Sequence, residues 1–241
     1  LPFTLSTDHL NQKLDQFTAG LPFAPGDLNL ENLLKRLQWI WLPVWLIDSE
    51  VRADWQAEAG FNYQVKSHEE RYGDAEGWKT KEVIETRQRW EPRLGRLERS
   101  YQNVTSQALD VYQIWIKHLG KYELAKSKPY APEVMFPVEA RKRAVVCLPD
   151  RSQQDAWPDA VPAFQALAGA GCREAIGADH IREFRWKPEF HHQNWSLLLL
   201  PALSTFYIDD DNQPQQVLIH GQTGKLSGVR KASLRRAQAM A

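Results

Sequence analysis

The chain has 241 residues, of which 43% are hydrophobic and 25% are charged, so it contains enough apolar area to form a folded core. Lys and Arg number 30, as do Asp and Glu, and this balance argues against wholesale binding to a nucleic-acid backbone, which needs clustered positive charge. The sequence has no apolar run of the ~20 residues that span a bilayer, and its start, LPFTLSTDHL, lacks the regions of a signal peptide.

The first part of the chain predicts two short helices. Ser6–Asp8 offers an N-cap, and apolar residues follow at helical spacing until Gly20. Asn29 is placed to cap a second helix over residues 30–37.

Strand patterns follow these helices. Gln38–Ile47 is apolar on both faces, which is typical of a strand buried on both sides, and Glu50–Ala57 alternates apolar and polar residues as a second strand would. A third strand pair is expected from Lys79–Trp90 and Arg96–Tyr101, because Glu91–Gly95 contains the Pro and Gly of a turn.

The middle of the chain reads as helix, crossing segment and helix. Residues 103–120 carry apolar residues on one helical face. Lys121–Pro137 holds three prolines and no clear period, so we expect it to cross between two units. The next helix should start near Pro158 or Pro162, since proline is best tolerated in a first turn.

The last part of the chain is dominated by an apolar strand pair. We expect an element over residues 172–186 that Pro188 ends, and then a strand over Asn194–Tyr207. An acidic turn at residues 209–212 leads to a returning strand over Gln215–His220.

These patterns predict an α+β fold of two similar units, each a helix with an antiparallel hairpin, forming curved antiparallel sheets covered by helices. The two apolar hairpins share a Leu-Pro step, Leu42-Pro43 and Leu200-Pro201. The expected division is a first unit over residues 1–120 with a long polar hairpin, the crossing segment over 121–137, and a second unit over 138–241.

Candidate binding residues fall into three groups. The aromatic residues Trp39, Trp41, Trp45 and Trp55 share a parity along the strands; they are either core or a partner-binding face. The second group is the motif Gly221, Gln222, Thr223 and Gly224, whose two glycines allow positive φ and predict a structural turn. The basic tail carries Arg230, Lys231, Arg235 and Arg236, which could meet an anionic membrane surface.

Other chemically active residue types favour structural roles. His191-His192 and the acids at 209–211 are metal-ligand types, but they lie at opposite ends of one strand, so we expect no metal site. His68-Glu69-Glu70 reads as a loop charge run, and His180 and His220 as packed or exposed histidines. Cys147 follows basic residues 141–143 that could lower its pKa, but its apolar neighbours favour a buried thiol.

Two further patterns concern cysteines and arginines. The two cysteines, Cys147 and Cys172, form no CxxC pair and are expected to be free thiols in a reducing compartment. A basic strip around the second hairpin could contact anionic lipid or nucleic acid, although interleaved Glu residues favour a salt-bridged wet face. Its members are Arg87, Arg89, Arg93, Arg96 and Arg99.

Three patches together resemble a bacterial family. They are Trp41-Leu-Pro-Val-Trp45-Leu-Ile-Asp48; Trp90-Glu-Pro-Arg-Leu-Gly95 with Tyr101-Gln-Asn103-Val104; and Leu200-Pro201 leading to Val217-Leu-Ile-His-Gly-Gln-Thr-Gly224-Lys225. The chain is similar to the soluble region of zinc-ribbon membrane proteins often labelled primosomal protein N′ or replication-restart helicase-like, which occur near phage-shock and flotillin-like genes. The resemblance implies a flanking zinc ribbon and membrane helices; the ribbon cysteines are not in this sequence, and Gly224-Lys225 is not followed by the Ser or Thr of a P-loop.

These observations lead to a non-catalytic interaction or scaffold domain of a membrane-associated bacterial protein in an envelope-stress assembly. We expect a protein partner at the inner face of the cytoplasmic membrane, no cofactor and no enzymatic activity. The alternatives are a nucleic-acid-associated module linked to replication restart, and a small-ligand binder or hydrolase with an apolar pocket. We expect the chain to be part of a longer protein, and the patterns leave its oligomeric state open.

Overall fold

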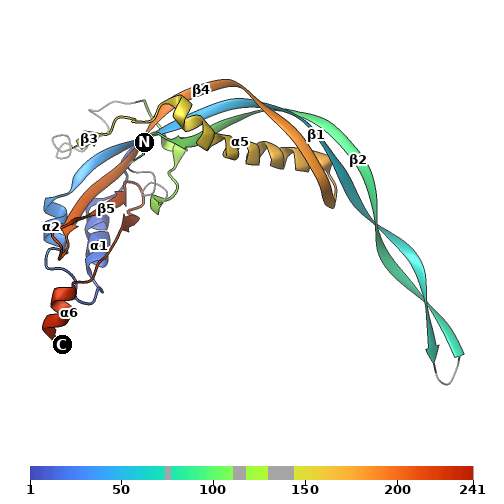
Figure 1. Cartoon of the computed structure of the whole chain (residues 1–241), viewed down its shortest axis with the longest axis horizontal. Helices are drawn as coiled ribbons and strands as arrows, with labels where there is room; N and C mark the ends of the chain where they lie inside the picture. Colours follow the sequence, from blue (N-terminus) through green and yellow to red (C-terminus); the bar gives the residue numbers. More distant parts are fainter. Residues whose placement is uncertain (74–76, 111–117, 130–143, 241) are drawn as a thin grey trace. The chain divides into compact units, whose positions relative to one another are not determined.

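The computed structural model describes residues 1–73, 77–110, 118–129 and 144–240, in which helices accompany one six-stranded sheet (Figure 1). The helices are α1 (Thr7–Thr18), α2 (Leu30–Lys35), α5 (Gln153–Ile176), α6 (Leu234–Met240) and the 3-10 turn η1 (Leu124–Lys126). The strands are β1 (Gln38–Gly73), β2 (Gly77–Gln107), β3 (Ala144–Val146), β4 (His180–Ile208), β5 (Pro214–His220) and β6 (Leu226–Gly228). The strand order is β2-β1-β4-β5-β6, with β3 parallel to β1, and the predicted α+β class is confirmed.

The chain divides into two compact units, each assembled from separate segments. The first unit contains Leu1–Leu46, Thr105–Trp157 and Ser196–Ala241, and the second contains Ile47–Val104 and Pro158–Trp195. This grouping differs from the sequential division expected at 121–137, of which residues 130–137 lie outside the described part. The reason is that β1 and β4 each contribute residues to both units, so contacts within a unit join segments far apart in sequence.

The sheet of the first unit is apolar on both faces. Alternate residues of β5 belong to different core clusters, since Val217 and Ile219 join one cluster and Leu218 joins the other. The first cluster also contains residues of α1, α2 and β4, namely Leu10, Leu14, Leu33, Leu203 and Tyr207. The second contains residues of β1 and β4, namely Ile40, Leu42, Val44, Leu198, Leu200 and Ala202. Such two-sided burial is what a continuous apolar run predicts.

The first two helices lie close to their predicted positions. The Ser6 hydroxyl accepts a hydrogen bond from the His9 N–H at 3.3 Å, and Gly20 follows α1 with a φ of 70°. The side chain of Asn29 accepts one from the Asn32 N–H at 2.9 Å and caps α2. Each cap satisfies a backbone donor that the helix itself leaves unpaired.

In the second unit, β2, β1 and β4 form a sheet with α5 on one face (Figure 1). Cys172 and Ile176 of α5 pack against alternate residues of β1 in one buried cluster, namely Trp55, Ala57 and Ala59. Because side chains alternate across a strand, the odd-numbered residues of β1 face the helix here and the even-numbered ones face away.

The turn predicted at Glu91–Gly95 is wrong, and the first two expected strands are not separate, because both strands continue. β1 is unbroken between the strands expected at 38–47 and 50–57, and β2 runs straight through Glu91–Gly95. β2 is the last strand in the sheet order, and an edge strand tolerates Pro92 because its outer side needs no N–H donor. At Gly95, an added Cβ would lie 2.5 Å from the Trp55 ring, so this glycine makes room for a neighbouring side chain.

Three further predictions of element boundaries also need correction. α5 begins at Gln153 and includes both Pro158 and Pro162, because Ser152 starts it: its hydroxyl accepts from the Asp155 N–H at 3.2 Å and donates to the Asp155 carboxylate at 2.6 Å. Pro188 does not end an element, since it lies inside β4. Of the helix expected at 103–120, residues 103–107 belong to β2, 111–117 lie outside the described part, and 118–119 are helical.

Replacing Gly95 by Ala should destabilise the second unit by roughly 1–3 kcal/mol, because the new methyl group would overlap the Trp55 ring. Urea denaturation followed by Trp fluorescence measures the change. Ser100→Ala, on the exposed surface of the same strand, is the control and should change stability by less than about 0.5 kcal/mol. A more stable Gly95→Ala variant, as strand propensity alone predicts, would contradict this packing.

Candidate functional site

The outer part of the β1–β2 hairpin is a two-stranded ribbon, which we call the arm: residues 61–73 of β1 and 77–89 of β2. A Cβ added at Gly60 would lie 3.1 Å from His180, the first residue of β4, so the third strand begins beside Gly60. Beyond this point β1 and β2 run on past the ends of β4 and α5 (Figure 1). A lone two-stranded ribbon is marginally stable in water, so its extension calls for a function.

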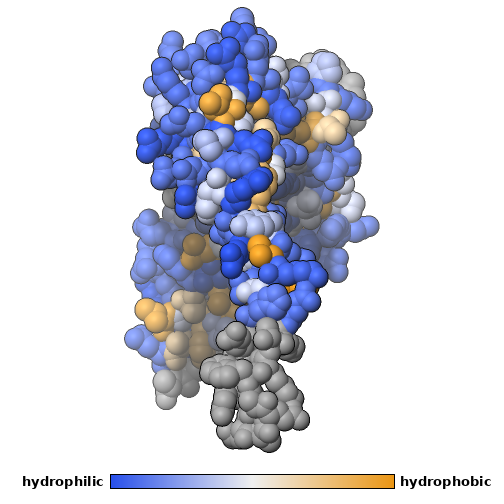
Figure 2. Space-filling view, turned by 90° about the vertical axis from the view of Figure 1, so that its right-hand side faces the viewer, coloured by the Kyte–Doolittle hydropathy of each residue, from blue (hydrophilic) through white to orange (hydrophobic). Residues whose placement is uncertain are grey.

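An apolar stripe continues along one face of β1 from the helix-covered core into the arm. Trp55, Ala57 and Ala59 are buried under α5, and Phe61 packs at the margin of the same cluster. Tyr63, the next residue of this parity, is 47% exposed, so the stripe reaches solvent on the arm. The surface seen in Figure 2 is otherwise mostly hydrophilic, with hydrophobic residues in small separate patches.

Four of the five arginines of the strip on β2 pair with neighbouring carboxylates. Arg87 pairs with Glu85 at 3.1 Å, Arg89 with Glu91 at 2.7 Å and Arg93 with Glu91 at 3.2 Å. Arg96 pairs with Asp54 of β1 at 2.8 Å, and Arg99 lies beside Gly171 of α5. The interpretation as a salt-bridged wet face is therefore confirmed for these four arginines, and exposed pairs of this kind stabilise a fold only weakly.

The four tryptophans of the predicted partner face do not share one environment. Trp41 is fully buried with its ring edge against Phe3, and Trp39 is half-buried against the same ring. Trp45 donates a hydrogen bond to the Arg151 carbonyl at 3.1 Å in the first unit, whereas Trp55 belongs to the core of the second unit. They pack as core residues, and Trp41 and Trp55 lack the exposure that a contact face requires.

The turn at Gly221–Gly224 joins β5 to β6 and is organised by His220. The Nδ1 atom of His220 accepts hydrogen bonds from the N–H groups of Gln222 (3.0 Å) and Thr223 (3.2 Å). Its Nε2 therefore carries the proton and donates to the Lys121 carbonyl at 3.2 Å. The ring stacks on Tyr122 with centroids 3.7 Å apart. One buried neutral imidazole thus holds both the turn and the segment Lys121–Tyr122 that packs against it.

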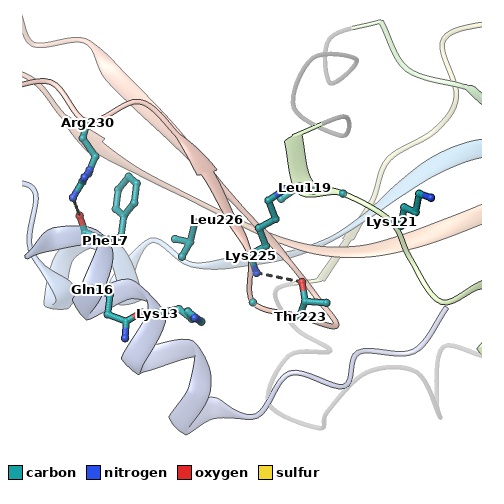
Figure 3. Close-up of a pocket in the computed structure, with 11 residues that line it drawn as sticks. Lys13, Gln16, Phe17, Leu119, Lys121, Thr223, Lys225, Leu226 and Arg230 are labelled. Carbon is teal, nitrogen blue, oxygen red and sulfur yellow. Dashed lines mark hydrogen bonds between the residues drawn. The ribbon is translucent and has the colours of Figure 1, made fainter. Parts of the chain in front are cut away.

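Glycine is required at both ends of this predicted turn. A Cβ at Gly221 would lie 2.5 Å from the Pro201 carbonyl oxygen, and Gly224 has a φ of 71°. The Thr223 hydroxyl accepts a hydrogen bond from the Lys225 N–H at 3.4 Å (Figure 3). The structural role predicted for the motif agrees with this geometry.

The basic tail folds back onto the acidic turn of the first unit. Lys231 pairs with Asp209 at 2.9 Å, and the Asp209 side chain is only 3% exposed. The Ser233 hydroxyl donates to Asp210 at 2.7 Å and caps α6 through the Arg236 N–H. The Lys231 ammonium lowers the pKa of Asp209. The tail and the acidic turn, which looked independent in the sequence, therefore bind each other.

The remaining predicted groups have local roles. Within the described residues, no group of three or more His, Cys, Asp and Glu side chains is placed to hold a metal ion. Both cysteines are free thiols as predicted, and burial raises the pKa of Cys147, although residues 141–143 beside it lie outside the described part. His191 and His192 face Glu189 and Glu50 respectively, and of the 68–70 charge run only His68 has a described, exposed side chain.

Comparisons with protein-family models, curated proteins and solved structures give no match to this chain. In the described part of the chain, no helix has the length and apolar character needed to cross a membrane.

The free energy of unfolding should fall as the pH drops below 6.5, the usual His pKa, because burial lowers the pKa of His220 and the unfolded chain binds a proton first. Each unit of pKa difference corresponds to about 1.4 kcal/mol. His220→Gln should reduce this pH dependence in denaturant titrations, whereas His9→Gln, on the exposed face of α1, should retain it. Equal slopes in wild type and His220→Gln would contradict a proton-sensitive imidazole at the turn.

Asp209→Asn should release the tail, because it removes the charge that holds Lys231. Limited trypsin digestion should then cleave after Arg235 and Arg236 several-fold faster than in the wild type. Asp211→Asn removes the same charge from an exposed position of the same turn and should leave the rate unchanged. Equal cleavage of the two variants would show that the ion pair does not hold the tail.

Proposed function

We propose that the chain is a non-catalytic interaction domain that binds a protein partner through its arm, as a scaffold at the inner face of a bacterial cytoplasmic membrane. The observation that carries the proposal is the apolar stripe of β1, which leaves the cover of α5 and continues to the exposed Tyr63. Solvent-exposed aromatic side chains on an extended ribbon suit a partner that packs along it.

The two kinds of hairpin support a scaffold role. In the second unit a helix packs on the β1–β2 pair, and in the first unit α1 and α2 pack on the β4–β5 pair. We infer that these are the two similar helix-plus-hairpin units expected from the sequence, and that each provides a rigid base. A rigid base lowers the entropy that a protruding arm would lose on binding.

The resemblance to zinc-ribbon membrane proteins supports membrane association and an envelope-stress assembly. The ion pairs of the arginine strip disfavour the nucleic-acid alternative, since a charge held by a carboxylate releases fewer counterions from a phosphate backbone. The basic tail offers less free positive charge to a membrane than its composition implies, because Lys231 is paired with Asp209.

Photo-crosslinking in cells tests the arm. A benzoylphenylalanine at Tyr63 should capture a single protein, whereas the same group at Leu167, which is comparably exposed on α5, should not. The purified partner should then bind the wild-type chain, and Tyr63→Asp should weaken binding by about tenfold or more with an unchanged melting temperature. Identical capture from Leu167, or unchanged affinity of Tyr63→Asp, would overturn the proposal.

A further inference from the structure

The first unit contains a cavity of about 770 Å³ that is independent of the arm. α1 lines one side with Lys13 and Phe17, and the loop between β5 and β6 lines the other with Thr223 and Lys225 (Figure 3). Arg230, which follows β6, lies at one end. The lining therefore joins segments about 200 residues apart in sequence.

The charges that line this cavity have one sign. Its lining includes Lys13, Lys225 and Arg230 and no acidic residue, and no salt bridge involving these three is found in the described residues. Glu123, near the same turn in the fold, is paired with Lys126 instead. Lys121 also borders the cavity, but its side chain points away from Lys13 and Lys225 in Figure 3. Unpaired like charges repel, so they raise the energy of the empty site.

The fold holds these cations in position. A Cβ at Gly224 would lie 3.4 Å from Cγ of Lys13, so the glycine lets the lysine stem lie against the turn. A Cβ at Gly120 would lie 3.6 Å from Nζ of Lys225, which places the ammonium beside the backbone. Arg230 donates to the Ala19 carbonyl at 3.2 Å through one nitrogen, and its guanidinium has further N–H groups. His220 fixes the turn that carries Thr223 and Lys225.

We propose that this cavity binds a phosphate monoester attached to an apolar or neutral body. A phosphate monoester carries about −1.5 to −2 charges at neutral pH, which suits a lining with three cations and no acid better than a single carboxylate does. Lysine ammonium groups bind phosphate as point charges, and arginine adds directed N–H donors. Phe17 and Leu226 line the cavity between the charges and can contact the apolar body. Both a soluble phosphorylated metabolite and the headgroup of phosphatidic acid present this chemistry.

The test uses two probes with the whole chain. Calorimetric titration with glycerol 3-phosphate measures binding of a soluble ester, and co-sedimentation with phosphatidylcholine vesicles, with and without phosphatidic acid, measures binding of the lipid. The variant is Lys13→Gln/Lys225→Gln, with Lys225→Gln alone as a milder change. Lys187→Gln is the charge-matched control for Lys225→Gln, since this lysine is exposed and lies in the second unit. Melting temperatures verify that every variant is folded.

Binding of either probe that falls by about tenfold or more in the double variant, and not in Lys187→Gln, supports the site. If the double variant loses binding of glycerol 3-phosphate, the ligand is a soluble ester. If it loses binding only of vesicles with phosphatidic acid, the ligand is the membrane lipid. The proposal is overturned when neither probe binds at physiological salt. It is also overturned when Lys225→Gln and Lys187→Gln weaken binding equally, because that result indicates a general charge effect.

Discussion

β1 has a hydrogen-bonded neighbour on each side, and this double pairing constrains the rest of the second unit. A strand paired on both sides cannot slip by one residue without turning its apolar side chains to the opposite face. The odd-numbered residues therefore stay directed at α5, and the same parity carries the apolar stripe outward to Tyr63. The arm inherits the register that the core imposes, which gives a protruding ribbon a defined contact face.

In the first unit, a buried imidazole has the comparable role. His220 accepts hydrogen bonds from two N–H groups of its own turn and donates one to the Lys121 carbonyl, so one side chain connects segments about 100 residues apart. The turn that it fixes also carries Thr223 and Lys225 into the cationic cavity. The glycines on either side serve close approach, since Gly221 lies against the Pro201 carbonyl and Gly224 against Lys13. A motif that appeared only structural thus also shapes a candidate binding site.

Local signals in the sequence predicted local structure well. The caps at Ser6 and Asn29, the acidic turn and the strand before His220 all depend on neighbouring residues, and all are present. Proline and glycine gave wrong turn predictions where packing against distant residues determines the structure. The sequence predicts a turn at Gly95, but this glycine makes room for the Trp55 ring of the neighbouring strand β1.

Features that depend on distant residues could not be read from short patterns. The pairing of Lys231 with Asp209 joins two charge runs that are independent in the sequence, where one predicts a membrane contact and the other a solvated turn. The cavity cations Lys13 and Lys225 had no signal at all, because neither belongs to a basic cluster in the sequence. The discontinuous units follow from the length of β1 and β4, which exceeds what hydrophobic alternation over a few residues could predict.

The position of β2 at the margin of the sheet has a consequence for how the protein behaves at high concentration. Its outer backbone groups could template a second copy, and the alternating Arg and Glu side chains of residues 85–93 discourage such stacking. Protection by charge weakens as salt screens it. High ionic strength should therefore favour edge-to-edge oligomers, and crystallisation from concentrated salt should tend to join molecules along this strand.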